Sequence, residues 1–212
     1  MNIVKQLLKI NFTKGRGNYK PEVIVIHIVE GTFLGKMEKL SAMQEFNAPT
    51  YKSAHYLIKE DGWIYQLVEE TDTAYHAGLK VNPTAEIVKS RPSVNPNVYS
   101  IGIESAGFSN IEPEQFDSLK ELVKDICRRW KIPVDRKHIL GHREIRADKT
   151  CPANIDVDRL VKEINEDDDK KLEQAICRNL EEENASLRKE LADYKQTNSS
   201  ILRWITDWLK GR

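Results

Sequence analysis

Runs of apolar residues along the first two thirds of the chain predict a series of β-strands. Residues 22–29 (EVIVIHIV) are β-branched and apolar almost throughout, which is typical of a central strand buried on both faces. Residues 55–59 and 63–68 flank an Asp-Gly pair and predict an antiparallel hairpin. The alternating pattern of residues 98–105 indicates a further strand, and residues 138–142 indicate a short one.

Segments with an apolar residue at every third or fourth position lie between these strands and predict helices. They are residues 36–46 and residues 113–130, the second with a proline in its first turn. Residues 71–97 are rich in Pro, Asn, Ser and Thr and predict long surface loops, which often carry binding residues. The sequence therefore predicts an α/β domain over residues 1–165, in which helices flank a mixed central β-sheet.

The character of the chain changes near residue 166, where a run of acidic residues opens a segment without glycine or proline up to Gly211. Heptads counted over residues 166–212 predict a helical coiled coil, through which the chain would form a homo-oligomer. The seam of these heptads comprises Cys177, Leu180, Asn184, Leu187, Leu191, Tyr194, Asn198, Ile201, Ile205 and Trp208. A single surface helix packed on the first domain is the alternative.

The last twelve residues contain Trp204 and Trp208 together with basic residues. Such a segment fits two roles equally well, weak contact with a membrane surface and the simple end of the coiled coil. Binding of the isolated peptide to anionic vesicles would distinguish the two.

Composition and charge narrow the class of protein. With 40% hydrophobic and 31% charged residues, the chain is globular rather than disordered or fibrous. Its 33 basic and 33 acidic side chains give a net charge of zero, so no nucleic acid partner is expected. Three widely spaced cysteines predict free thiols rather than a disulfide framework. No segment has the pattern of a signal peptide or a membrane span, so we expect synthesis in the cytoplasm.

Two histidines and a cysteine stand where they could hold a metal ion. His27 lies near the end of the first predicted strand, His142 follows the last one, and Cys151 precedes a proline. Hydrolytic zinc sites use three ligands of these types and leave a fourth position to water. Each of these residues alone is more often a structural residue, so their joint pattern carries the metal hypothesis.

The strand that ends in His27, the IGIE strand, and GHREIRADKTCP at residues 141–152, in that order, resemble the N-acetylmuramoyl-L-alanine amidase family. This family includes bacteriophage amidase-type lysozymes and peptidoglycan recognition proteins. The resemblance spans about residues 20–160 and implies that His27, His142 and Cys151 bind Zn²⁺. A cysteine at this position favours an enzyme, because recognition proteins that bind without cutting usually lack this ligand.

The resemblance also implies roles for three further residues. Glu104 corresponds to a glutamate that acts as general base, Lys149 to a lysine that steadies the oxyanion, and His76 to a residue of a loop that contacts the substrate. Alone, Glu104 and Lys149 would be taken as solvated charges, and His76 as a loop residue without a role. Some phage members carry a catalytic tyrosine where this chain has Ala54, which makes Glu104 more necessary for proton transfer.

The resemblance therefore implies hydrolysis of the amide bond between N-acetylmuramic acid and L-alanine in peptidoglycan. The expected protein is a phage or prophage endolysin, a bacteriolytic and antimicrobial enzyme that acts on the bacterial cell wall after its release. One alternative is a bacterial cell-wall recycling amidase, and another is a module that binds peptidoglycan without cutting it. His55 and His138 are predicted to be structural, because three ligands already complete a catalytic zinc site.

Overall fold

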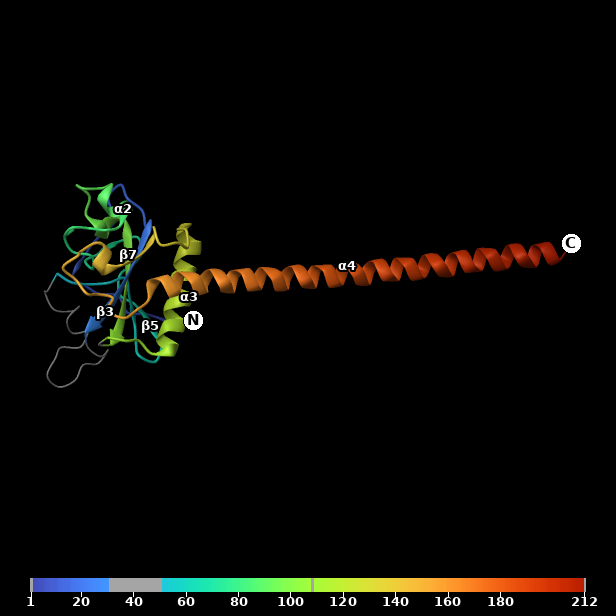
Figure 1. Ribbon diagram of the computed structural model, residues 1–212, viewed down its shortest axis with the longest axis horizontal. Coiled ribbons are helices and arrows are strands. Elements are labelled where there is room, and N and C mark those ends of the chain that lie inside the picture. The colour runs from blue at the N-terminus through green and yellow to red at the C-terminus, as the bar shows by residue number, and fades with distance from the viewer. Residues whose placement is uncertain (1, 31–50, 108, 212) are drawn as a thin grey trace. The chain divides into compact units, whose positions relative to one another are not determined.

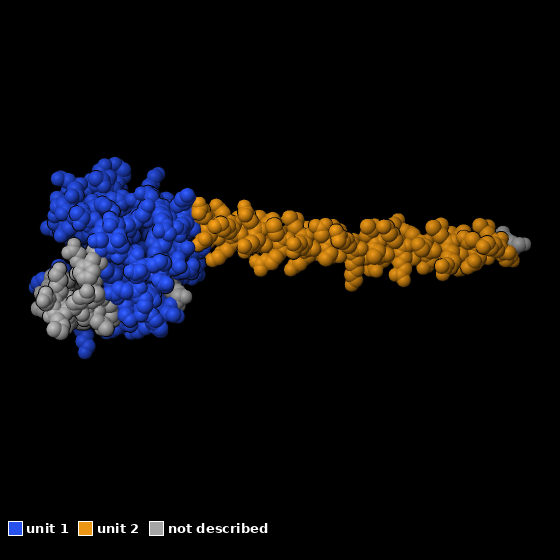
Figure 2. Space-filling view, turned by 60° about the horizontal axis from the view of Figure 1, so that its bottom comes forward, with its two compact units in different colours: residues 1–165 blue, residues 166–212 orange. Residues whose placement is uncertain are grey.

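The computed structural model describes residues 2–30, 51–107 and 109–211 (Figure 1). The chain divides into two compact units, residues 1–165 and residues 166–212 (Figure 2). Across the described residues, no helix offers a stretch long and apolar enough to cross a membrane.

Unit 1 is built on a six-stranded sheet with the order β1-β5-β4-β7-β3-β8. The strands are β1 (Ile3–Lys5), β3 (Val23–Glu30), β4 (Tyr56–Ile58), β5 (Ile64–Gln66), β7 (Ser100–Gly107) and β8 (Ile139–Gly141). Strands β4, β7, β3 and β8 run parallel, whereas β5 pairs antiparallel with β4 and β1 runs parallel to β5. The prediction of a mixed sheet is therefore confirmed. Strands β2 (Phe12–Thr13) and β6 (Thr73–Ala74) form a separate antiparallel pair.

Among the described residues, the helices are α2 (Glu86–Lys89), α3 (Pro113–Trp130) and α4 (Val157–Lys210), with 3₁₀ turns η1 (Pro96–Val98) and η2 (His142–Glu144). Helix α3 covers the predicted residues 113–130. It has a proline at its first position, and its last residue, Trp130, is followed by Lys131, which adopts a left-handed conformation with φ 56°. The predicted helix at residues 36–46 lies outside the described residues.

The two faces of the sheet have different partners because side chains alternate along a strand. Ile24 and Ile26 of β3, together with Ile101 and Ile103 of β7, are fully buried in one cluster with helix α3. Helix α3 contributes Phe116, Leu119, Leu122, Val123, Ile126 and Cys127, and the first two turns of α4 contribute Val157, Leu160, Val161 and Ile164. This face therefore forms the main core, and α3 lies along the sheet in Figure 1.

The opposite face of the same strands carries two of the candidate site residues, His27 and Glu104. On β3, His27 follows Val23 and Val25 at the two-residue spacing, and on β7 Glu104 follows Ser100 and Gly102. His27 and Glu104 are register partners. The predicted strand over residues 98–105 ends one residue after Glu104, whereas β7 continues to Gly107, so Glu104 lies inside the strand.

Unit 2 consists of the part of α4 from residue 166 onward. Its large apolar side chains are exposed in the isolated chain, and they include Leu172, Ile176, Leu180, Leu187, Leu191, Tyr194, Ile201, Leu202, Trp204, Ile205, Trp208 and Leu209. The helix agrees with the sequence pattern, and the coiled coil stays a prediction.

Candidate metal centre and active site

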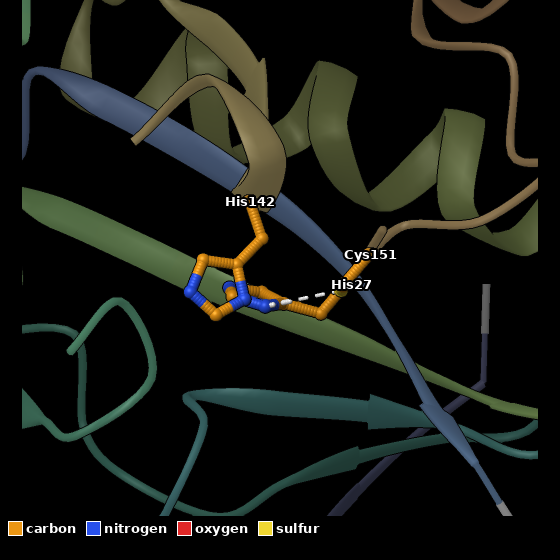
Figure 3. Close-up of side chains that lie close together, drawn as sticks. All are labelled: His27, His142 and Cys151. Atoms are coloured by element: carbon orange, nitrogen blue, oxygen red, sulfur yellow. Dashed lines mark hydrogen bonds between the residues drawn. The ribbon is translucent and has the colours of Figure 1, made fainter. Parts of the chain in front are cut away.

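The three predicted metal ligands come from separate segments of unit 1 and converge. His27 lies on β3, His142 opens the η2 turn directly after β8, and Cys151 follows in the next loop. One donor atom from each residue lies within 4.8 Å of the others. Figure 3 shows the three side chains pointing toward one another, with the dashed line joining His27 and Cys151.

The spacing of these donors fits a zinc ion. Zinc–nitrogen bonds of 2.0–2.1 Å and a zinc–sulfur bond of 2.3 Å, arranged as a tetrahedron, set nitrogen and sulfur about 3.6 Å apart. The Nδ1 atom of His27 lies 3.7 Å from Cys151 Sγ. Two imidazoles and one thiolate also match the donor types that zinc prefers. The residues present therefore fit this metal.

The second nitrogen of each histidine ligand has a partner in the protein. His27 Nε2 lies 3.1 Å from His76 Nδ1, and His142 Nε2 lies 3.1 Å from the carbonyl oxygen of Ala77. In both rings Nδ1 is thus left to face the metal position. Partners of this kind orient ligand rings and are a regular feature of metal sites.

Burial controls the charge of the donor groups. It lowers the pKa of His27 well below the ordinary range, and the neighbouring His142 and His76 act in the same direction. Burial likewise lowers the pKa of His142. Both rings are therefore neutral at pH 7, which is the form that binds metal.

Cys151 is held as a thiol in the metal-free protein. Burial first, and then the nearby Glu104 carboxylate, raise the pKa of Cys151 to about 12. The backbone amide of Ile28 opposes this shift by donating to Sγ at 3.4 Å. A bound cation would deprotonate the thiol.

All six predicted site residues line one cavity of about 750 Å³. Besides the three ligand residues, they are Glu104, Lys149 and His76. Glu104 Oε1 lies 3.9 Å from His27 Nδ1, because the two residues are partners on adjacent strands. His76 is buried, and burial lowers its pKa well below the ordinary range. Its two ring nitrogens lie 3.1 Å from His27 Nε2 and 3.2 Å from Ser100 Oγ.

Two residues of the site were not found from the sequence. Ser100 and Gly102 lie on β7 on the same face as Glu104 and contact the His76 ring. A glycine inside an otherwise apolar strand often marks a close approach of another group, so Gly102 was the available signal. His55 and His138 were predicted to be structural. His55 is fully buried. His138 Nδ1 lies 2.7 Å from Asp135 Oδ1, and His138 does not line the cavity.

A family model described as N-acetylmuramoyl-L-alanine amidase matches residues 17–154, which is more than half of the chain. The chain belongs to the N-acetylmuramoyl-L-alanine amidase family. The amidase match includes β3, β7 and the loop that carries Cys151, and it ends before unit 2 begins.

Two curated relatives belong to the same class of amidase by name. The 1,6-anhydro-N-acetylmuramyl-L-alanine amidase AmpD of Haemophilus influenzae is 36% identical over 124 residues, which are 55% of this chain and 60% of that protein. The N-acetylmuramoyl-L-alanine amidase AmiD of Escherichia coli is 31% identical over 142 residues, which are 58% of this chain and 45% of that protein. The chain thus matches about half the length of these relatives.

Solved structures share the fold at lower identity. The N-acetylmuramoyl-L-alanine amidase LysC from Clostridium intestinale has a TM-score of 0.56 at 22% identity, covering 78% of this chain and 98% of that chain. The catalytic domain of XlyA has a TM-score of 0.57 at 18% identity, covering 77% and 99%. These similarities place unit 1 in the amidase fold.

Proposed function

We propose that this chain hydrolyses the amide bond between N-acetylmuramic acid and L-alanine in peptidoglycan, with zinc held by His27, His142 and Cys151. The observation that carries the proposal is the set of three donor atoms within 4.8 Å of one another, with the Glu104 carboxylate beside them on the same cavity. Two neutral imidazoles and a thiolate would hold zinc through three protein ligands, the number that catalytic zinc sites use.

Zinc, when bound, supplies the Lewis acidity that lowers the pKa of water and polarises the carbonyl of the scissile amide. Glu104 takes a proton from the attacking water and passes it to the departing amine of L-alanine. Lys149 donates a hydrogen bond to the oxyanion. Ala54 is fully buried and carries no hydroxyl, so the proton transfer rests on Glu104. The predicted substrate contact of His76 would use the ring edge, because both of its nitrogens have partners.

The direct test is zinc-dependent release of new L-alanine amino termini from purified peptidoglycan by the full chain. Glu104→Gln removes the base and is expected to lower kcat by at least about 100-fold. Cys151→Ser is expected to lower the affinity for zinc. Matched controls are Glu86→Gln on the exposed surface of α2 and Cys177→Ser in unit 2, and both are expected to keep full activity.

The outcome of this test separates an enzyme from a binding module. A folded, zinc-loaded chain that retains muropeptide and releases no amino termini would support the module that binds without cutting. Equal activity of Glu104→Gln and the wild-type chain would remove the proposed mechanism.

Rates of cleavage on two substrates would distinguish an endolysin from a recycling enzyme. The endolysin role stays a prediction, and a recycling enzyme is the alternative. The name of one relative, AmpD of Haemophilus influenzae, gives a 1,6-anhydro-muramyl compound as its substrate. We propose the endolysin role and therefore expect faster cleavage of intact peptidoglycan sacculi than of soluble 1,6-anhydro-muropeptides. The reverse preference would favour a recycling enzyme.

We further propose that unit 2 joins copies of the chain. The support is a seam that repeats every seven residues and is exposed in the single chain, with Leu180 and Leu187 about half exposed. Light scattering of the full chain and of a chain ending at residue 166 tests this. The truncation keeps the buried first turns of α4, so unit 1 is expected to stay folded. An unchanged monomeric mass of the full chain would end the proposal.

Cys177 occupies a seam position and offers a test of orientation. In a parallel, in-register dimer the two copies of Cys177 would face each other across the seam and form a disulfide with a mild oxidant such as diamide. Cys127 is buried and Cys151 lies in the cavity of unit 1, so loss of the cross-link in Cys177→Ser would assign it. An oligomer that never cross-links would be antiparallel or out of register.

Membrane contact of the C-terminal tip is a separate proposal. It is supported by the exposed indoles of Trp204 and Trp208, which are 68% and 48% accessible in the single chain. The chain is expected to bind vesicles with anionic lipid weakly, and Trp204→Ser with Trp208→Ser is expected to abolish that binding. Retained binding in the double variant would refute the contact.

A further inference from the structure

A chain of hydrogen bonds reaches His27 through the ring nitrogen that does not face Cys151. His27 Nε2 lies 3.1 Å from His76 Nδ1, and His76 Nε2 lies 3.2 Å from Ser100 Oγ. Ser100 Oγ in turn lies 2.7 Å from the carbonyl oxygen of Pro96. His27, His76 and Ser100 are all buried.

The Pro96 carbonyl, at the end of this series of hydrogen bonds, sets the direction of every bond in it. The Pro96 carbonyl oxygen can only accept, so the single hydroxyl hydrogen of Ser100 points to it. The Ser100 oxygen then accepts from His76 Nε2–H, which leaves His76 Nδ1 with a lone pair. With both rings neutral, His27 must donate through Nε2–H and keep the lone pair on Nδ1.

The opposite direction is less favourable. It would turn the Ser100 hydroxyl away from Pro96 at 2.7 Å and toward His76 at 3.2 Å. It would also put the proton of His27 on Nδ1, the atom 3.7 Å from Cys151 Sγ, where it would block a metal ion. The shorter bond and the metal position therefore select the same tautomer.

Gly102 makes this arrangement possible. It lies between Ser100 and Glu104 on one face of β7, and the His76 ring packs directly over it. A Cβ atom at position 102 would lie 2.3 Å from His76 Cγ, which is closer than atoms can approach. Any larger residue would push the ring away from both of its partners.

The segment that carries His76 also serves the other histidine ligand. The carbonyl of Ala77 accepts from His142 Nε2 at 3.1 Å. The side-chain oxygen of Asn97 accepts from the backbone amides of His76 and Ala77 at 3.2 and 2.8 Å. The dipeptide His76–Ala77, held by Asn97, thus contacts both imidazole ligands.

We propose that His76 is a positioning residue that fixes His27 with its proton on Nε2 and its Nδ1 toward the metal, with Ser100 setting the direction of the bonds. The proposal rests on the zinc site proposed above. It gives the His76 nitrogens a role in metal binding instead of substrate recognition. Partners of this kind typically contribute 10–100-fold to metal affinity.

The test measures the zinc dissociation constant of the full chain by competition with a chromogenic chelator. His76→Phe keeps a ring of similar size and removes the acceptor, so it is expected to weaken zinc binding by about 10–100-fold. His76→Asn places Oδ1 where Nδ1 stood and is expected to recover most of the loss. The visible absorption of the cobalt-substituted chain reports the ligand geometry and is expected to change in the phenylalanine variant and not in the asparagine variant.

Two serine variants on β7 test the proposal independently, in case the His76→Phe variant does not fold. Ser100→Ala removes the acceptor of His76 and is expected to weaken zinc binding. Ser105→Ala removes a buried hydroxyl on the α3 face of the same strand and is expected to leave the affinity unchanged. Equal zinc affinity in wild type, His76→Phe and Ser100→Ala would overturn the positioning role and leave the amidase proposal intact. A wild-type chain that binds no zinc would refute the amidase proposal itself.

Discussion

His55 makes the stability of unit 1 depend on pH, and its environment gives the size of the effect. The ring is fully buried, and its Nδ1 accepts from the backbone amide of Gly102 at 3.0 Å. Its Nε2 lies 2.7 Å from Arg16 Nη2 and 3.2 Å from the carbonyl oxygen of Asp72. A doubly protonated ring would therefore face a donor at each nitrogen, the Gly102 amide at Nδ1 and the Arg16 guanidinium at Nε2.

Burial, followed by the charge of Arg16, lowers the pKa of His55 from 6.5 to about 3. The unfolded chain therefore binds a proton at His55 at a higher pH than the folded chain does. The contribution of neutral His55 to the free energy of unfolding is thus fully present above pH 6.5 and is lost as the pH falls toward 3. At pH 5 the loss from this residue is about 2 kcal/mol relative to pH 7. Such a loss is a sizeable part of the stability of an ordinary domain.

Urea unfolding at pH 7 and pH 5, in the presence of a chelator, measures the effect. His55→Asn keeps an oxygen for the Gly102 amide and has no group that titrates in this range. The variant is expected to be less stable at pH 7, and to lose about 2 kcal/mol less than the wild type between pH 7 and pH 5. The same loss in both proteins would show that His55 is not the buried neutral group described above.

Three further predictions concern the core, a partly buried ion pair and catalysis. Leu122→Ala in α3 removes a fully buried side chain from the main core and is expected to lower the free energy of unfolding by about 2–5 kcal/mol in urea. Arg129→Leu leaves the buried Glu70 carboxylate with only neutral donors and is expected to cost about 1–3 kcal/mol, most of which Glu70→Gln should restore in the double variant. Lys149→Ala is expected to lower kcat by about 10²–10³ with little change in KM if the lysine stabilises the oxyanion, and a change in KM alone would assign it to substrate binding.

The elements predicted from the sequence are those with a strong local pattern. The buried run of residues 22–29 and the periodicity of residues 113–130 are long enough for apolar spacing to identify a strand and a helix. Strands β1 and β2 were not predicted, because they have three and two residues and are defined by their partners β5 and β6. Pairing of this kind depends on residues about 60 positions away, which no local pattern contains.

The residues of the candidate site also differ in whether the sequence alone can identify them. His27, His142 and Cys151 could be named because metal ligands are of few types and the family pattern orders them. Ser100 and Ala77 could not be named, because one acts through an ordinary hydroxyl and the other through a backbone carbonyl. Every residue type offers the same backbone carbonyl at position 77, so the sequence carries no signal for it.

The register of β3 against β7 links the core to the site. Ile26 is paired with Ile103, and the next residues, His27 and Glu104, are paired on the opposite face. A shift of one residue would turn Glu104 into the apolar cluster under α3 and bring Ser105 to the cavity. The free energy that buries the isoleucines against α3 is therefore also what holds the carboxylate beside the metal ligands. Core substitutions that loosen this pairing should lower zinc affinity and catalysis together, whereas substitutions in the loops can change one without the other.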